Sequence, residues 1–137
     1  MDFDSTQPIW LQLVGEFSRR IGAGEWRPGA RIPAVRDLAA ELQVNPNTVQ
    51  RAFGELERDR LVRSERTSGR FVTDDATLIR TLRRRLVADA ADAYARRAAG
   101  VGLPLADAQA LLAERWSEHD HENPDEHDTH VSHRAEG

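Results

Sequence analysis

The chain has 137 residues, enough for one domain with an appendage and too few for a large second domain. It contains no Cys, which excludes disulfides, thiolate zinc sites and thiol nucleophiles. The formal charge of -4 hides an uneven distribution, because residues 9–72 hold eleven Arg against eight acidic residues and residues 117–137 hold one Arg against seven. Without that acidic end the chain carries +2, so the average does not exclude a polyanionic partner.

The first half of the chain predicts three helices. In the first, which follows Pro8 and ends at the glycines of 22–24, the apolar residues recur at helical spacing: Trp10, Leu13, Val14, Phe17 and Ile21. The second has its apolar face on Val35, Leu38, Ala39 and Leu42. Asn45 and Pro46 begin the third, since Asn is a preferred N-cap and Pro suits the first helical position. Its predicted buried face is Val49, Ala52, Phe53 and Leu56.

The second half predicts a hairpin and two further helices. Strands are expected at residues 61–64 and 70–73, joined by a turn in which Gly69 takes a positive φ. A helical pattern then runs to about Ala99, is stopped by Gly100 and Gly102, and resumes from about Leu105 to Trp116. Residues 118–137 have the composition of a disordered acidic tail.

Two helices joined by residues 43–45 and followed by a hairpin form a winged helix-turn-helix pattern. With its apolar residues inward, the third helix exposes side chains suited to DNA: Asn47, Thr48, Gln50 and Arg51. Short polar groups at a helix N-terminus can approach phosphates, helped by free backbone N–H groups, while Arg pairs with guanine and Gln with adenine. A three-helix core whose polar face is merely solvated fits the spacing about equally well.

The residues themselves resemble a known family. Pro33-Ala-Val-Arg-Asp-Leu-Ala39, Val44-Asn-Pro-Asn-Thr-Val-Gln-Arg-Ala52 and Glu55-Leu-Glu57 closely resemble the DNA-binding domain of GntR-family bacterial transcription regulators. The run from Val44 to Val49 is similar to the YtrA-type branch in particular. The resemblance covers about residues 7–73, and the remainder to Trp116 suits the short two-helix dimerisation segment of that branch.

The resemblance implies roles for nine residues. Arg36 matches a position that reaches DNA, and five others match recognition-helix positions that contact phosphates and bases: Asn45, Asn47, Thr48, Gln50 and Arg51. Ser68, Gly69 and Arg70 match the wing tip, which in this family lies against the minor groove. The chain departs from the family pattern at Ala34, which lacks a capping hydroxyl, at Thr67, which replaces a wing glycine, and at Arg70, where Thr or Ser is common.

The helices of residues 78–116 have an apolar stripe that one chain can bury only in part, so a symmetric dimer is favoured over a cap on the DNA-binding domain. Its predicted members are Leu78, Leu82, Leu86, Ala90, Leu112 and Trp116. Such a dimer places two recognition helices about 34 Å apart, as an inverted repeat requires. This short segment offers little room for a ligand pocket of about 300 Å³ or more, except between subunits.

All five His lie near the C-terminus: His119, His121, His127, His130 and His133. With Asp and Glu they are candidate ligands for Zn, Ni or Cu, but Asn123-Pro124 breaks a helix and no apolar frame fixes a geometry, so no specific metal site is expected. The acidic tail is also expected to compete with DNA for the Arg-rich face and so to lower non-specific binding.

The predicted fold is mainly α with a small β wing. It comprises a winged helix-turn-helix domain at residues 7–74, a two-helix dimerisation segment at 75–117 and a tail at 118–137. We expect a homodimeric, cytoplasmic transcription repressor that binds an inverted-repeat operator in double-stranded DNA, without a cofactor and with an unknown small-molecule or metal effector as an open partner. No apolar stretch reaches the ~18 residues of a membrane span, and no catalytic motif indicates an enzyme. The alternatives are a metal-responsive regulator that uses the His-rich tail and a protein-interaction module that does not bind DNA.

Overall fold

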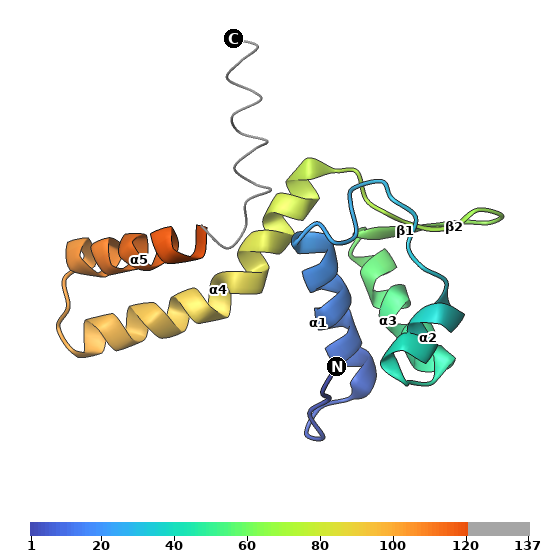
Figure 1. The fold of residues 1–137 in the computed structure, drawn as a ribbon, viewed down its shortest axis with the longest axis horizontal. Helices are drawn as coiled ribbons and strands as arrows, with labels where there is room; N and C mark the ends of the chain where they lie inside the picture. Colours follow the sequence, from blue (N-terminus) through green and yellow to red (C-terminus); the bar gives the residue numbers. More distant parts are fainter. Residues whose placement is uncertain (121–137) are drawn as a thin grey trace, which may run out of the picture. The chain divides into compact units, whose positions relative to one another are not determined.

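The computed structural model of the chain describes residues 1–120, which form two compact units that meet between Asp89 and Ala90. The first unit contains α1 (Ile9–Gly22), α2 (Val35–Leu42), α3 (Pro46–Arg58), β1 (Val62–Glu65), β2 (Gly69–Val72) and the beginning of α4 (Ala76–Gly100). The second contains the rest of α4 and α5 (Leu105–Asp120). Figure 1 shows these elements, and the expected fold class, mainly α with a small β wing, is confirmed.

The three N-terminal helices begin and end as the sequence predicts. Asn45 caps α3, since its Oδ1 accepts a hydrogen bond of 2.8 Å from the backbone N–H of Asn47, and Pro46 occupies the first turn. Ala34 precedes α2 without a side-chain cap, as expected from the missing hydroxyl. The turn between α2 and α3 depends on Gln43, whose φ of 56° places it in the left-handed region.

The core of the first unit is aromatic at its centre. The rings of Phe17 and Phe53 stack at 4.9 Å between centroids, and Trp26 lies 5.2 Å from Phe17. Trp10 was expected on the buried stripe of α1, but the core takes the face through Leu13 instead and Trp10 stays only half-buried. The apolar stripe of α1 is wider than the surface that the core covers, so the residue at its edge stays partly in solvent.

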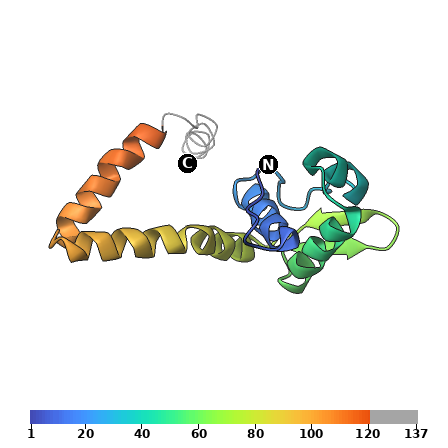
Figure 2. The same ribbon diagram turned by 90° about the horizontal axis from the view of Figure 1, so that it is seen from below.

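The wing is a two-stranded antiparallel hairpin whose pairs run from Val62 with Val72 to Glu65 with Gly69. Both strands lie one residue nearer the turn than predicted. The backbone N–H of Leu61 ends α3 by donating to the Leu56 carbonyl, and Gly69, at φ 104°, pairs where another residue would be strained. Arg31 adds a bridge to Phe71. Figure 2 shows the turn of the hairpin extending beyond α2 and α3.

The sequence predicts a domain boundary before α4, between residues 74 and 75. In the structure the boundary between the two units falls inside α4. Ile79 and Leu82, in the first turns of α4, are 3% and 1% exposed because they belong to the winged-helix core. Arg83 also donates a hydrogen bond of 2.9 Å to the carbonyl of Gly22 at the end of α1. The first turns of α4 therefore belong to the first unit.

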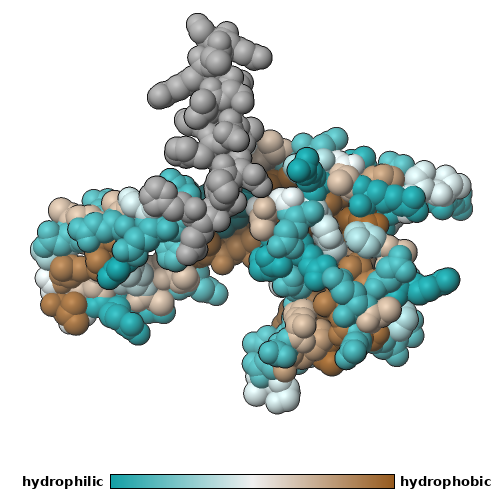
Figure 3. Space-filling model, viewed as in Figure 1, coloured by the Kyte–Doolittle hydropathy of each residue, from teal (hydrophilic) through white to brown (hydrophobic). Residues whose placement is uncertain are grey.

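The second unit is a helical hairpin. The chain turns between α4 and α5 through Gly102 at φ 74°, and the Tyr94 hydroxyl donates a hydrogen bond of 2.6 Å to the Ala108 carbonyl. Of its described residues only Ala98 and Ala108 are buried, whereas Leu105 is 73% exposed. Apolar surface accordingly shows at this turn in Figure 3. Helix α5 continues to Asp120, beyond the predicted end at Trp116, and the tail predictions for residues 121–137 lie outside the described residues.

Candidate nucleic-acid interface

Helix α3 presents the two faces that the sequence predicts. Its apolar side chains are buried: Val49, Ala52, Phe53 and Leu56. The opposite face exposes Asn47, Gln50 and Arg51, with Thr48 half-buried beside them. A helix of this kind, buried on one face and polar with short and long donors on the other, has the chemistry to approach a polyanion.

The N-terminal backbone of α3 is less available than expected. The cap from Asn45 takes the N–H of Asn47, the N–H of Thr48 donates to the Asn45 carbonyl, and Pro46 has no N–H. The expectation of free backbone donors at this end is therefore wrong, because the capping turn already uses them. Polar side chains and the helix dipole remain as the means by which this end can attract phosphate.

The guanidinium of Arg51 lies over an aromatic ring. Its guanidinium carbon lies 4.2 Å from the ring centroid of Trp10 in α1. Arg51 makes no hydrogen bond or ion pair with any other residue of 1–120, so its N–H donors are all free for a ligand. Trp10 is a neighbour of the candidate site that the sequence did not indicate, because helical spacing predicts it in the core.

Arg70 of the wing is tied to α3 and does not extend freely at the wing tip. Its Nε donates to Glu57 Oε1 at 3.0 Å, its Nη2 donates to Gln50 Oε1 at 2.7 Å, and its guanidinium lies 5.1 Å from the Phe53 ring. The Ser64 hydroxyl donates to the same Glu57 oxygen. Burial would raise the pKa of Glu57, but the hydrogen bonds from Ser64 and Arg70 lower it on balance.

The wing turn carries a second cation from outside the hairpin. Ser68 and Gly69 are exposed there, as predicted, and a Cβ placed on Gly69 would lie 3.2 Å from Nε of Arg31. Arg31 therefore lies along the wing, although the sequence analysis gave it no role. The sequence places Arg31 directly before Ile32-Pro33, but it does not indicate the bridge between Arg31 and Phe71.

The remaining arginines differ in whether they form ion pairs within residues 1–120. Arg19 and Arg20 are both bound to Glu16, and Arg63 pairs with Glu65. The pKa of Glu16 is lowered, first by the hydrogen bond from Arg19, against the opposing effect of burial. Arg36, in the first turn of α2, is exposed and makes no such pair with the described residues.

The predicted DNA-contacting residues thus fall into those that hydrogen-bond within the protein and those whose side chains do not. It joins Asn45 with Asn47 and Gln50 with Arg70. The side chains of Arg36, Thr48 and Ser68 make no hydrogen bond within residues 1–120.

The predicted dimerisation residues fall into three groups. Leu82 is buried in the core of its own chain, which removes it from a surface available to a second subunit. Leu78 is half-buried and Leu86 is 41% exposed beside α1. In the second unit, Leu112 and Trp116 are 49% and 66% exposed, and Ala90 is exposed as well.

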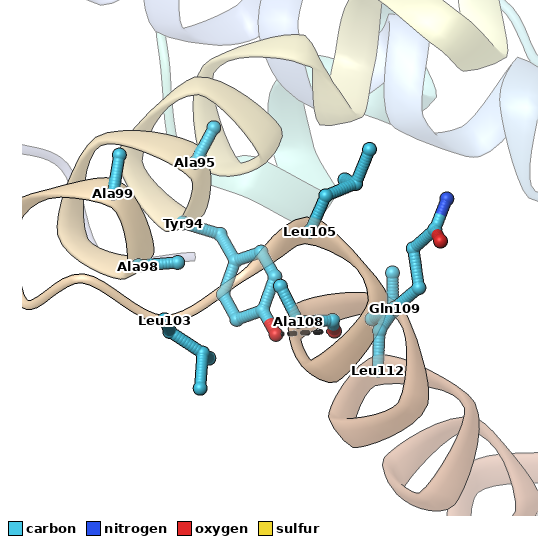
Figure 4. Close-up of a pocket in the computed structure, with 9 residues that line it drawn as sticks. All are labelled: Tyr94, Ala95, Ala98, Ala99, Leu103, Leu105, Ala108, Gln109 and Leu112. Atoms are coloured by element: carbon cyan, nitrogen blue, oxygen red, sulfur yellow. Dashed lines mark hydrogen bonds between the residues drawn. The ribbon is translucent and has the colours of Figure 1, made fainter.

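An apolar cavity of about 320 Å³ lies between α4 and α5 in the second unit. Figure 4 shows Tyr94 lying across it toward Ala108, with Leu103, Leu105 and Leu112 around it. The short segment thus leaves a larger hollow within one chain than the sequence predicts, because small residues such as Ala98 line it.

Within residues 1–120, no helix has the length and hydropathy of a membrane span. Nor does that part of the chain bring three or more His, Asp or Glu side chains together as metal ligands.

Comparison with known proteins connects this geometry to a family. Residues 11–72 match the family model of bacterial regulatory proteins of the gntR family. The HTH-type transcriptional regulator YhcF of Bacillus subtilis is 33% identical over 101 residues, covering 74% of this chain and 84% of YhcF. The HTH-type transcriptional repressor YtrA of the same organism is 31% identical over 99 residues, covering 66% of this chain and 76% of YtrA.

A solved structure agrees. The GntR family transcriptional regulator from Listeria monocytogenes superposes with a TM-score of 0.71 at 28% identity, covering 82% of this chain and 98% of the other. This chain is therefore a DNA-binding transcription regulator that belongs to the GntR family, in its YtrA-type branch.

Proposed function

We propose that the protein is a cytoplasmic repressor that binds an inverted-repeat operator as a homodimer, with α3 in the major groove. The observation that carries this proposal is Arg51, an exposed cation on α3 that is oriented by Trp10 and keeps all its N–H donors free. A guanidinium whose position is restricted by a neighbouring ring pairs with guanine O6 and N7 at a smaller entropic cost than a mobile one.

The other predicted residues divide between base and backbone contacts. Arg36 and Gln50 are exposed and long enough to reach base edges, so we assign them to base recognition with Arg51. Asn47 and Thr48 lie in the first turn of α3, where the helix dipole favours phosphate, and Asn45 sets that turn by capping it. At the wing we assign the groove contact to Ser68 and Gly69, together with Arg31, whereas Arg70 is held against α3 by Glu57 and Gln50.

The dimer is supported by apolar side chains that the second unit leaves in solvent. Leu105, Leu112 and Trp116 lie on α5 at helical spacing and are 73%, 49% and 66% exposed. Large apolar side chains gathered on one helix are typical of a protein interface. A two-fold symmetric partner buries them against the same residues of a second copy and places two α3 helices on one operator.

Selection of bound sequences from random duplex DNA tests the proposal. We expect recovery of an inverted repeat whose half-sites are one helical turn apart, about 34 Å, and two chains per duplex. Enrichment of no sequence would overturn the DNA-recognition role, and enrichment of a single half-site bound by one chain would overturn the dimer.

Repeating the selection with and without Zn²⁺ addresses the metal-responsive alternative. Four of the five His of the C-terminal region lie outside the described residues, so a regulator that uses them stays a prediction. We expect no change in the enriched sequence or in its affinity with the metal, and a change would make the tail a sensor.

A further inference from the structure

The wing and the recognition helix are joined by a chain of hydrogen bonds that reaches a base-recognising side chain. Glu57 accepts from Arg70 Nε at 3.0 Å, and Arg70 Nη2 donates to Gln50 Oε1 at 2.7 Å. Glu57 is also fixed by the Ser64 hydroxyl, so α3, β1 and β2 all contribute. The Arg70 side chain is only 27% exposed and lies over Phe53, which limits its freedom to leave.

This arrangement determines which way the Gln50 amide faces. Its oxygen is bound to Arg70, whereas its NH₂ group makes no hydrogen bond with any residue of 1–120. A free Gln amide recognises adenine by donating to N7 and accepting from N6, and it needs both of its ends for that. Arg70 uses one of the two lone pairs of that oxygen and places a cation beside it, which makes the oxygen a weaker partner for a second donor such as adenine N6.

We propose that Arg70, held by Glu57, is a specificity-determining positioning residue that restricts Gln50 to donating hydrogen bonds. Gln50 then favours guanine, which presents two acceptors in the major groove, O6 and N7. It disfavours adenine, whose N6 amino group is a donor beside the N7 acceptor. This inference rests on the proposed function, since it requires that α3 enters the major groove.

The experiment compares base preference among the wild type and three variants in the same selection. Arg70→Met removes every N–H donor but keeps an unbranched side chain over Phe53. Arg63→Met is the matched control, because Arg63 also lies over a wing aromatic, 5.5 Å from Phe71, and pairs with carboxylates, yet makes no bond to Gln50. Gln50→Ala identifies the base position that depends on Gln50, and circular dichroism confirms that each variant is folded.

The wild type is expected to enrich a G·C pair at that position. Arg70→Met is expected to shift the preference toward an A·T pair by at least about fivefold, the lower end of what a bidentate base contact contributes. Arg63→Met should leave the preference unchanged. An A·T pair at this position in the wild type, no shift in Arg70→Met, or an equal shift in Arg63→Met would overturn the inference while the repressor function stands. Absence of any enriched sequence would instead overturn the proposed function, and the inference with it.

Discussion

Replacing Trp10 by Leu should weaken operator binding without unfolding the protein. The substitution keeps an apolar side chain in α1 but removes the ring on which the Arg51 guanidinium lies, 4.2 Å from its centroid. Because Trp10 is half-buried and Arg51 is exposed, the interaction belongs to the weaker class of cation–π contacts, about 0.5–1 kcal/mol. That energy corresponds to a loss of roughly two- to fivefold in operator affinity.

A double-mutant cycle separates this mechanism from a direct contact between Trp10 and DNA. Arg51→Ala alone should cost about 1–3 kcal/mol if Arg51 pairs with a base. In that background Trp10→Leu should cost nothing further, since the residue it orients is absent. Leu11→Ala, which alters an apolar side chain of α1 that is 44% exposed, serves as the control and should leave affinity unchanged.

Fluorescence anisotropy with a labelled operator duplex at fixed salt measures all four affinities of the cycle, and thermal unfolding checks that each variant is folded. An equal loss from Trp10→Leu in the wild-type and Arg51→Ala backgrounds would refute the argument. It would mean that Trp10 acts on DNA binding without Arg51.

Three further predictions concern stability and assembly. Ala34→Ser should supply the missing cap of α2 and raise the free energy of unfolding by about 0.5–2 kcal/mol, as denaturant titration would measure; no gain would mean that the hydroxyl finds no backbone N–H. Because Arg19 lowers the pKa of Glu16 in the folded state, the stabilisation is present above the unfolded-chain pKa of about 4.3 and is lost as pH falls below it. Glu16→Gln should therefore flatten the fall of Tm below that pH, and an unchanged slope would exclude this pair as a cause. Leu112→Asp should convert the proposed dimer to a monomer in sedimentation equilibrium, as should Trp116→Asp, and a dimer in both variants would place the interface elsewhere.

Local signals in the sequence were sufficient to predict the winged-helix fold. The cap at Asn45, the apolar periodicity of α3 and the turn glycine at residue 69 each act within a few residues of themselves, and each has the predicted role in the structure. The resemblance to GntR regulators, carried by short runs of residues, is likewise confirmed by the family model over residues 11–72.

What the sequence could not supply were contacts between distant segments. The ring beneath Arg51 comes from Trp10, 41 positions away, and helical spacing alone cannot separate a core aromatic from one at the edge of the core. The hydrogen bond from Arg70 to Gln50 likewise requires the hairpin to fold back onto α3. The apolar stripe of α4 looked continuous, yet Leu82 serves the core of its own chain.

The most direct test of the central claim compares two duplexes in one titration. One carries the selected inverted repeat and the other the same bases in scrambled order, both at physiological salt. Sequence-specific recognition through α3 predicts that the repeat binds at least about a thousandfold more tightly, and that Arg51→Ala loses most of its affinity on the repeat alone. Equal affinity for the two duplexes would mean that charge alone attracts this protein to DNA, and would contradict the account.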